Sequence, residues 1–456
     1  MQHDAQPADE RGAPGIPPPG VAATAYAIEL LRSLGQPCPG ADDLATASPQ
    51  ALAQAVAKDW AASGLMPLCG EAAAPPQRAR HAIPSCARGA LLAFRTIAGC
   101  EVLPGVDGAT LLSERAAFHG RLRAGRVSVN GQCHLLRTRD GWLAINLARE
   151  DDLALLPAWL AVVDAGPPPH EAERLAAGDI TALQAVIRLR SSRALVARGA
   201  LFGLPVAAPA EAAPPQGWFA RATRAAVQAP ARMPHVLDLS SLWAGPLAAH
   251  LLLAAGAVVT RVENEMRPDA SRDALPAFHA LLNAGKRACS LNFAHAAGLA
   301  ALRAHIDAAD IVLESARPRA LQQLGIDAEE ILARSPGKLW LRIAGHDQAA
   351  GNGPDSDPDP DAALPRVAFG DDAAIAGGAA LEGVDGPRFC GDALADPLTG
   401  LHAATAALAH WRTGHGGLLT LSLAGVTRWC VERTRHIPLL QPDAATLRSP
   451  ALRPTA

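Results

Sequence analysis

Short apolar runs alternate with amphipathic stretches throughout the second half of the chain. The runs HVLDL at 235–239, VVTRVE at 258–263 and KLWLRIAG at 338–345 favour strands, and the segments between them repeat apolar residues at helical spacing. Strands that alternate with helices through short loops form crossover units and a mainly parallel sheet. The pattern therefore predicts an α/β fold with a Rossmann-like, doubly wound sheet over residues 231–430, where ligands bind at the carboxyl ends of the strands.

The first half of the chain has a different pattern, in which helical periodicity gives way to a pair of strands. Helical spacing runs through residues 21–105. In the following segment, GRVSVNGQCHLLRTRDGWLAINLA, the dipeptides Asn130-Gly131 and Asp140-Gly141 are typical of hairpin turns between β-prone runs. We therefore expect a helical segment at 21–105 and a small, hairpin-containing α+β domain at 106–202.

Proline and alanine mark the boundary between the halves. Residues 203–234 contain PVAAPAEAAPPQG and QAPARMP, and proline interrupts helices and lacks a backbone donor. We expect an extended tether here, with one or two helical turns in WFARATRAAV, then a large domain at 235–435 and a tail at 436–456. The first twenty residues lack the charged-then-apolar order of a signal peptide, which predicts a disordered lead at 1–20.

Composition narrows the classes of partner. The formal net charge is −3, from 41 basic and 44 acidic side chains, and such a balance predicts neither a nucleic-acid partner nor a charged membrane surface. The sequence has no uninterrupted apolar run of about 18 residues, as a membrane span requires. Its eight cysteines are scattered with no CxxC pair, which argues against a disulfide scaffold or a zinc site and favours a reducing, cytoplasmic location.

The first strand–helix turn of the large domain, SSLWAGP at 240–246, can be compared with the pattern of a dinucleotide-binding turn. A nicotinamide- or flavin-binding turn has the pattern GxGxxG and an acidic residue about twenty positions later. Glu263 has the required spacing, but Gly245 is the single glycine of the turn. We therefore expect no permanently bound nucleotide cofactor.

Two acidic positions near the end of the domain are candidates for chemistry. Asp396 precedes Pro397 and a long apolar helix, where a carboxylate caps the helix amides and its pKa falls near the positive end of the helix. A nucleophilic carboxylate needs the same environment, so a structural and a catalytic role both stay open. Asp371 and Asp372 precede Gly377-Gly378, a pair that either offers backbone amides to an oxyanion or belongs to a surface turn.

The large domain resembles a known enzyme family in four blocks that occur in the family's order. The blocks are HVLDLSSLWAGPLAAHLLLAAGAVVTRVE, GKRACSLN, ADIVLESARPRALQQLGID and ADPLTGLHAATAALAHWRTGHGG. They are similar to class III CoA-transferases, a group that includes formyl-CoA transferase, carnitine CoA-transferase and, by shared fold, alpha-methylacyl-CoA racemase. The resemblance covers roughly residues 235–430. It implies transfer of CoA from an acyl-CoA to a carboxylic acid acceptor through an aspartyl-CoA thioester, with coenzyme A as part of the substrate.

The resemblance also assigns residues. It carries the nucleophile to Asp396, beside which Asp371, Gly377 and Gly378 are the candidates for positioning and for holding an oxyanion. CoA is expected along the first strand–helix turn, the end of the second strand, the Lys-Arg pair and the segment after the fourth strand. The positions in these elements are Leu242, Trp243, Ala244, Gly245, Glu263, Arg267, Lys286, Arg287, Ser315, Ala316, Arg317 and Arg319.

Several departures from the family leave alternatives open. Racemases carry Gly-His-Asp where this chain has Gly370-Asp371-Asp372, and the missing histidine favours transfer over racemisation. The pair Ser315-Ala316 replaces a common Asn-Phe, and Gln323 replaces a common arginine, whose charge Arg317 or Arg319 can supply. The alternatives are a racemase-like isomerase and an inactive CoA-binding or scaffold homologue.

The order of segments is unusual for the family. Members begin with the strand found here at 235 and place their small domain after the catalytic helix, whereas here a similar hairpin comes first. Residues 59–77 are similar to the glycine segment before the catalytic aspartate, but the following residues 78–94 contain no aspartate. We interpret residues 21–105 as a degenerate copy of that segment, which leaves one active site per chain. Family members form interlocked dimers, so we expect either a homodimer or an internal replacement for it.

Overall fold

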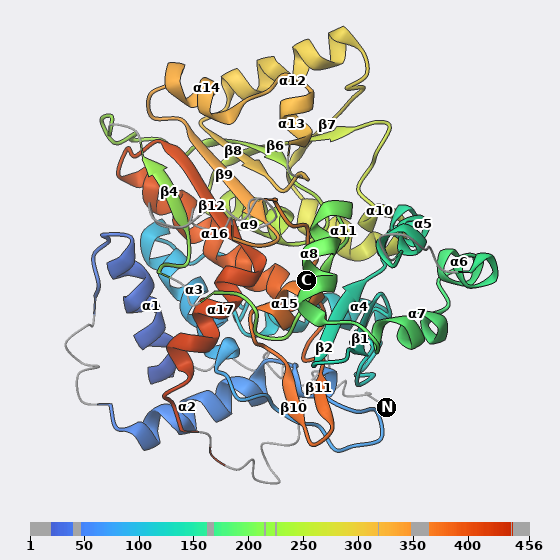
Figure 1. Cartoon of the computed structure of the whole chain (residues 1–456). Helices are drawn as coiled ribbons and strands as arrows, with labels where there is room; N and C mark the ends of the chain where they lie inside the picture. Colours follow the sequence, from blue (N-terminus) through green and yellow to red (C-terminus); the bar gives the residue numbers. More distant parts are fainter. Residues whose placement is uncertain are drawn as a thin grey trace, which may run out of the picture.

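The large domain is built on one mainly parallel sheet. The computed structural model describes residues 20–39, 47–161, 168–213, 216–223, 226–317, 319–347, 364–438 and 440. The sheet order is β4-β12-β9-β8-β5-β6-β7 (Figure 1). Its parallel strands are β5 (His235–Leu239), β6 (Val258–Asn264), β7 (Arg287–Leu291), β8 (Ile311–Glu314), β9 (Leu339–Ala344) and β12 (Gly417–Ser422). Numbered along the chain, these six run 3-2-1-4-5-6, the order of the Rossmann fold, so the predicted fold class is confirmed.

Helices cover both faces of the sheet because the strands are apolar on both sides. Val236 and Leu237 are both buried, and they belong to two different hydrophobic clusters. The cluster of Val236 contains residues of α9 (Ala244–Ala254) and α16 (Ala395–Arg412). The cluster of Leu237 contains residues of α12 (Ala296–Ala308) and α14 (Ala328–Arg334). Successive side chains of a strand point to opposite faces, which is why adjacent residues join separate cores.

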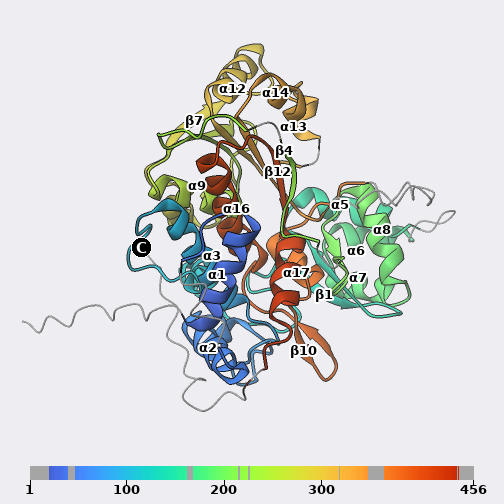
Figure 2. The ribbon, with the colours of Figure 1, turned by 90° about the vertical axis from the view of Figure 1, so that its left-hand side faces the viewer.

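The central helix α16 is buried along almost its whole length, which fits its apolar sequence. It packs against α9, against α3 (Ile83–Ala98) of the N-terminal segment and against α17 (Leu423–Thr434). The short helix α15 (Gly370–Ala376) lies beside its first turns. The remaining N-terminal helices α1 (Val21–Ser33) and α2 (Pro49–Ala62) stack on α3 (Figure 2). The N-terminal segment therefore shares one hydrophobic core with the large domain.

A second, smaller unit lies to one side of this body (Figure 2). Its three-stranded sheet pairs β1 (Cys133–Arg137) with β2 (Trp142–Asn146) and β2 with β3 (Val206–Ala207), and the hairpin expected at Asp140-Gly141 is present. The unit has a hydrophobic cluster of its own. Its helices are α5 (Glu150–Trp159), α6 (Pro169–Ala176), α7 (Ile180–Ile187) and α8 (Ser192–Phe202), and α4 (Glu114–His119) precedes the hairpin. Other short elements among the described residues are α10 (Ser271–Ala274), α11 (Pro276–Asn283), α13 (Ala320–Gln323), β10 (Leu381–Gly383), β11 (Gly386–Arg388) and the 3-10 helices η2 (Met66–Leu68) and η3 (Thr110–Ser113).

One local prediction is wrong. The helical turns expected in WFARATRAAV are replaced by strand β4 (Ala220–Thr223), which pairs antiparallel with β12. The exposed edge of β12 offers unpaired backbone groups, and satisfying them outweighs the local helical preference of an Ala-Arg segment. Most of the lead at 1–20 and of the tail at 436–456 lies outside the described residues.

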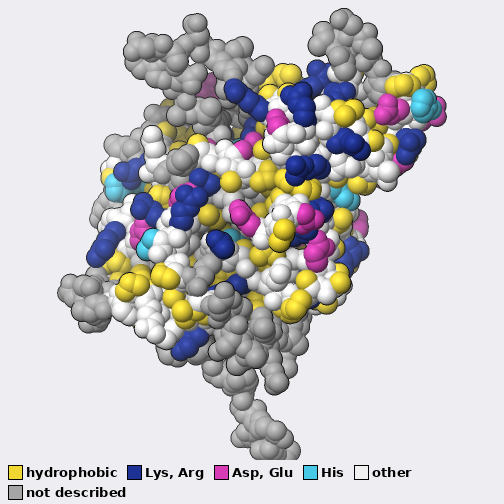
Figure 3. Space-filling view, turned by 60° about the horizontal axis from the view of Figure 1, so that its bottom comes forward, with side chains coloured by type: hydrophobic (Ala, Val, Ile, Leu, Met, Phe, Trp, Pro, Cys, Tyr) yellow, Lys and Arg dark blue, Asp and Glu magenta, His cyan; other side chains and the backbone are white. Residues whose placement is uncertain are grey.

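The surface agrees with the near-neutral charge. The face drawn in Figure 3 carries basic, acidic and apolar side chains intermingled. Among the described residues, no helix is long and apolar enough to cross a membrane.

The docking of α1 on α16 depends on a buried polar contact that can be tested. The Tyr26 hydroxyl donates to Nε2 of His402 at 2.8 Å, because Nδ1 of that ring donates to the Leu398 carbonyl at 2.7 Å. We expect Tyr26→Phe to lower the free energy of unfolding by about 1–3 kcal/mol, since it removes the hydroxyl donor of a buried ring nitrogen and leaves Cys430 Sγ, 3.9 Å away, as its remaining partner. The measurement is urea denaturation. The double variant with His402→Leu removes both partners and should lose less than the sum of the single variants; strict additivity would contradict the contact.

Candidate active site

Asp396 occupies the first turn of α16, directly after a tight loop. Gly391 (φ 86°) and Ala393 (φ 47°) have left-handed backbone conformations in that loop. The backbone N–H of Gly370 lies near the Asp396 carboxylate and lowers its pKa, and a Cβ atom at position 370 would collide with Asp396 Oδ2. Glycine at 370 therefore allows the start of α15 to approach this carboxyl group.

A buried ion pair holds the same loop from the other side. Arg115 of α4 donates through Nε to Asp392 Oδ2 at 2.8 Å and through Nη2 to Oδ1 at 2.5 Å, and His119 Nε2 lies 3.0 Å from Oδ2. The guanidinium also lies over the ring of Trp243, 5.3 Å from its centroid. Although burial raises the pKa of Asp392, Arg115 and His119 together hold it well below its usual range. Asp392 is therefore a charged anchor of the loop.

Two further carboxyl groups, Asp371 and Asp372, lie in the first turn of α15. Asp371 accepts the Ala393 N–H at 2.7 Å and the Asn130 side-chain amide at 3.1 Å, yet burial and the nearby Asp392 raise its pKa to about 6. Burial raises the pKa of Asp372 to about 8, and its Oδ2 has no hydrogen-bond partner among the described residues. At neutral pH Asp372 is therefore mostly protonated, because burial penalises the charged form.

The protonation state predicted for Asp396 is wrong. The sequence led us to expect a capping carboxylate with a lowered pKa, but the N-cap position of α16 is Leu394, and no side chain caps this helix. Burial, with Asp371 and Asp392 nearby, raises the pKa of Asp396 to about 7, although Arg115 opposes the shift. The desolvation penalty is larger than the favourable effect of the helix end.

Arg115, His119 and Asn130 are residues of this site that the sequence reasoning missed. All three precede the large domain and contact residues more than 240 positions later in the chain. None of the three belongs to a sequence motif of a functional site, and the dipeptide Asn130-Gly131 predicts a hairpin turn but no contact with a distant residue. The site is thus assembled from both halves of the chain.

The first strand–helix turn has the form expected of a ligand-facing loop. Leu242 has φ 68°, and its N–H donates to Asp269 Oδ2 at 3.0 Å. A Cβ atom on Gly245 would collide with Ser240, so glycine lets α9 start close to the strand end. Ser315, in the segment after β8, contacts this turn, because its hydroxyl accepts a hydrogen bond from the Ser241 N–H at 3.3 Å. This turn and the segment after β8 therefore meet where the direction of strand order reverses, between β5 and β8.

The Lys-Arg pair does not act as a unit. Lys286 is buried, and its Nζ forms an ion pair with Asp238 at 2.9 Å and donates to the Pro246 carbonyl at 2.9 Å. Arg287 is exposed at the start of β7, the edge strand. The ammonium of Lys286 is therefore committed to the interior, and Arg287 alone is accessible to a ligand.

Glu263 takes part in a network of charges at the end of β6. Together with Asp269 and His279 it places three potential ligand atoms within 4.8 Å of one another. Arg261, however, contacts both carboxylates, at 2.5 Å to Glu263 and 2.7 Å to Asp269, and Arg272 also binds Glu263. The guanidinium groups occupy the place of a cation, so we assign no metal to this cluster.

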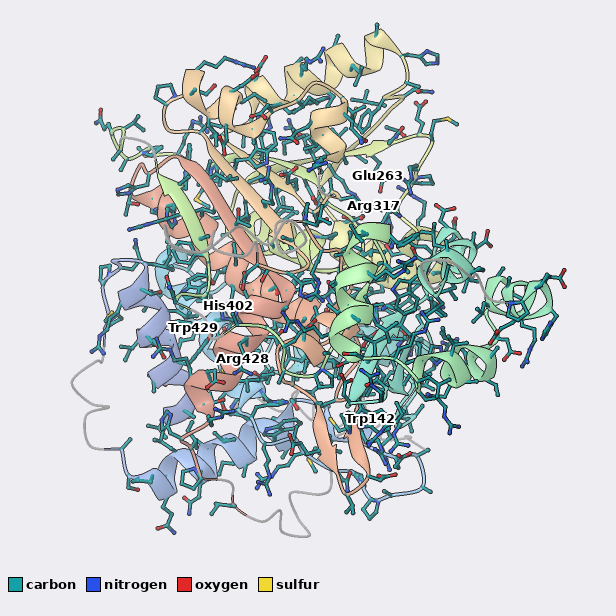
Figure 4. The ribbon with its side chains drawn as sticks, viewed as in Figure 1. Trp142, Glu263, Arg317, His402, Arg428 and Trp429 are labelled. Atoms are coloured by element: carbon teal, nitrogen blue, oxygen red, sulfur yellow. The ribbon has the colours of Figure 1, made fainter. Side chains whose placement is uncertain are left out.

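Three arginines converge at the same edge of the sheet. Arg317 is exposed, but partial desolvation and the neighbouring cations Arg149 and Arg267 still lower its pKa. Arg149 belongs to the small unit and pairs with Asp152 at 2.7 Å. Figure 4 shows Arg317 and Glu263 at this end of the large domain. The positive charge gathered here suits a phosphate group.

The other predicted positions are more scattered. Gly377 and Gly378 follow the far end of α15, whereas Asp396 contacts its first residue, so their oxyanion role stays an untested prediction. Trp243 and Ala244 are buried at the start of α9, and Ala316 and Arg319 are exposed.

Comparisons with known proteins agree with the resemblance. Residues 234–445 match the model of CoA-transferase family III, so this part of the chain is similar to that family. Formyl-CoA:oxalate CoA-transferases of Escherichia coli O6:H1 and of Shigella boydii serotype 18 are each 31% identical over 207 residues, which cover 41% of this chain and 46% of the relative. The chain therefore spans about half the length of the curated relatives it matches.

Two solved structures are similar in part. A hypothetical protein from Mycobacterium tuberculosis is 26% identical with a TM-score of 0.36, covering 42% of this chain and 55% of that chain. A CAIB/BAIF family protein from Brucella suis is 25% identical with a TM-score of 0.37, covering 43% of this chain and 53% of that chain.

The buried ion pair of Lys286 generates a stability prediction. We expect Lys286→Ala to lower the free energy of unfolding by about 3–5 kcal/mol, because it leaves the buried Asp238 without a counter-charge. Arg287→Ala is the matched control and should change stability by less than about 0.5 kcal/mol. Chemical denaturation of both variants gives the comparison, and equal effects would contradict the assignment of Lys286 to the interior.

Proposed function

We propose that this protein transfers CoA between carboxylic acids, with Asp396 as the nucleophile. The observation that carries the proposal is a difference in exposure within the carboxyl cluster. Asp371, Asp372 and Asp392 are buried, whereas Asp396 is partly exposed. A nucleophile must reach the substrate carbonyl, and Asp396 is the member of the cluster that does so without rearrangement. The match of residues 234–445 to the model of CoA-transferase family III supports the reaction class.

The exchange of CoA between two acids proceeds through successive covalent intermediates on the Asp396 carboxylate. The Asp396 carboxylate attacks the thioester carbonyl of the donor acyl-CoA, which forms a mixed anhydride and releases the CoA thiolate. The thiolate attacks the aspartyl carbonyl of the anhydride, so that an aspartyl-CoA thioester forms and the donor acid leaves. The acceptor carboxylate then attacks the aspartyl carbonyl of this thioester, which forms a second mixed anhydride and releases the CoA thiolate. The thiolate attacks the acceptor carbonyl of that anhydride, which yields the new acyl-CoA and frees the Asp396 carboxylate.

The surrounding groups support this chemistry in different ways. Arg115 lowers the pKa of Asp396 against the effect of burial and so increases the fraction of reactive anion. The Gly370 amide lies beside the same carboxyl group, and it is a candidate to stabilise the negative oxygen formed when the aspartyl carbonyl is attacked. Arg317, Arg267 and Arg149 are the candidates to bind the CoA phosphates at the carboxyl edge of the sheet.

A racemase-like isomerase is the second candidate, and one observation favours it. Burial raises the pKa of Asp371 to about 6 and that of Asp396 to about 7, values that suit a base and an acid at neutral pH. Against it, Asp371 is buried and both of its oxygens accept hydrogen bonds. The two candidates differ in a single measurement, because isomerisation incorporates deuterium from heavy water at the alpha carbon of the acyl group and CoA transfer does not.

The nucleophile can be identified by trapping. After incubation with an acyl-CoA, hydroxylamine should convert position 396 to a hydroxamate, which peptide mass spectrometry detects. Asp396→Asn should remove the adduct and lower the transfer rate by at least about 10³-fold, because an amide cannot form the anhydride. The fold should persist, since the change removes a carboxyl group from a cluster of like charges. Asp371→Asn is the control that keeps the hydroxamate at 396, and a hydroxamate at 371 or 372 would refute the assignment.

The raised pKa of Asp396 predicts the pH dependence. Because the anion attacks, the rate of adduct formation should rise about tenfold per pH unit up to pH about 7 and then level. Asp392→Asn should move the midpoint to lower pH, since it removes a neighbouring negative charge and leaves Arg115 to act on Asp396. Glu382→Gln, on the exposed part of β10, is the control and should leave the midpoint unchanged. A wild-type midpoint near pH 4 would contradict the raised pKa of Asp396.

A further inference from the structure

The segment around Cys69 pairs with the segment that leads into the Asp396 loop. Cys69 and Cys390 face each other in an isolated antiparallel bridge. The Gly70 N–H donates to the Phe389 carbonyl at 3.3 Å, and the Gly391 N–H donates to the Leu68 carbonyl at 3.2 Å. These bonds join the residues that flank the two cysteines, so the cysteines occupy a non-hydrogen-bonded pair, the closer type of antiparallel pair.

This position has the geometry that a cross-strand disulfide requires. Residues of a non-hydrogen-bonded pair have Cα atoms about 4.5 Å apart, within the range of about 4.4–6.8 Å found for disulfides. Their side chains project to the same side of the ribbon, and the two Sγ atoms lie 2.6 Å apart. A bond between them therefore needs no movement of the main chain.

The environment of the two cysteines slows the reaction of their reduced thiols with oxidants. Both cysteines are buried, and burial and the neighbouring Cys69 raise the pKa of the Cys390 thiol well above its ordinary value. The neutral thiol reacts slowly with oxidants. Once one sulfur is oxidised, however, the second is already in place to attack it.

We propose that Cys69 and Cys390 form a reversible disulfide that ties the N-terminal segment to the loop carrying Asp392 and Asp396. With a hydroperoxide as oxidant, one thiolate attacks the peroxide oxygen and becomes a sulfenic acid while water or an alcohol leaves. The second thiol attacks the sulfenic sulfur and displaces a further water. The two thiols lose two hydrogen atoms, and the peroxide is reduced. A dithiol reverses the reaction by exchange.

The bond would constrain the loop at its first residue. Cys390 directly precedes Gly391, and four residues separate it from Ala395, where α16 begins. In the reduced protein the Arg115–Asp392 ion pair holds the same loop. Oxidation adds a covalent connection between residues 321 positions apart, which restricts the unfolded chain and raises the melting temperature.

The experiment uses tryptic peptides that separate the relevant cysteines. The full chain is exposed to hydrogen peroxide, unfolded with iodoacetamide and digested without reduction. Cys69 falls in peptide 59–78 and Cys390 in peptide 389–412, and neither contains another cysteine. We expect a species that joins these two peptides, two hydrogen atoms lighter than their sum, which dithiothreitol removes. The oxidised protein should also melt at a higher temperature than the reduced one.

Matched variants separate the pair from general oxidation. Cys69→Ala and Cys390→Ala should each abolish the linked species and the rise in melting temperature, whereas Cys100→Ala, at an exposed cysteine, should keep both. Oxidation of Cys100 in the wild type shows that the peroxide dose was sufficient. If the two peptides then still carry the iodoacetamide label, or if the link joins 81–88 to 429–433, which hold Cys86 and Cys430, the proposal is wrong.

Discussion

The ion pair between Arg115 and Asp392 is the interaction on which the candidate site depends. Asp392 is fully buried, and the side chain of Arg115 is 20% exposed. Charges taken out of water are tolerated only with close, hydrogen-bonded geometry, and here both carboxylate oxygens are bound. The loop before α16 is therefore fixed by Arg115 of α4, a residue that precedes the large domain in the chain. Asp396 follows Asp392 by four residues, directly after the loop that this ion pair holds, so its position depends on the same contact.

The carboxyl cluster also determines which of its members bind a proton near neutral pH. Arg115 interacts with Asp371, Asp392 and Asp396, so one guanidinium faces three carboxyl groups. It cannot neutralise them all in a region of low polarity, and Asp392 receives the direct contacts. The others reduce the repulsion by binding protons near neutral pH, as their raised pKa values indicate. A carboxyl group whose pKa lies near neutral pH can act either as an acid or as a nucleophile. The cluster is therefore compatible with both CoA transfer and isomerisation.

Much of the fold could be predicted from the sequence, because the strands that form the sheet are short apolar runs with a consistent period. The residue pattern left Asp396 open to a structural or a catalytic role, and the family resemblance, through the order of its blocks, assigned it the role of nucleophile. The prediction for Lys286 could not succeed from sequence alone, since its partner Asp238 lies 48 positions away and burial is a tertiary property. Strand β4 was missed for the same reason, as the edge of β12 that pairs with it lies almost 200 residues later.

The bridge at Cys69 and Cys390 bears on the origin of the N-terminal segment. Its two hydrogen bonds are reciprocal, each linking the residue after one cysteine to the residue before the other. Helices α3 and α16, which follow the two cysteines, pack against each other, and each carries a proline in its first turn. Two copies of one segment facing each other would produce this local two-fold arrangement. The first copy has Ile83 and Pro84 where the second has Asp396 and Pro397, so a carboxylate is missing at the start of α3. On this interpretation the N-terminal copy has lost the nucleophile and kept the packing surface, and the chain after it supplies the Arg115 that fixes the surviving site.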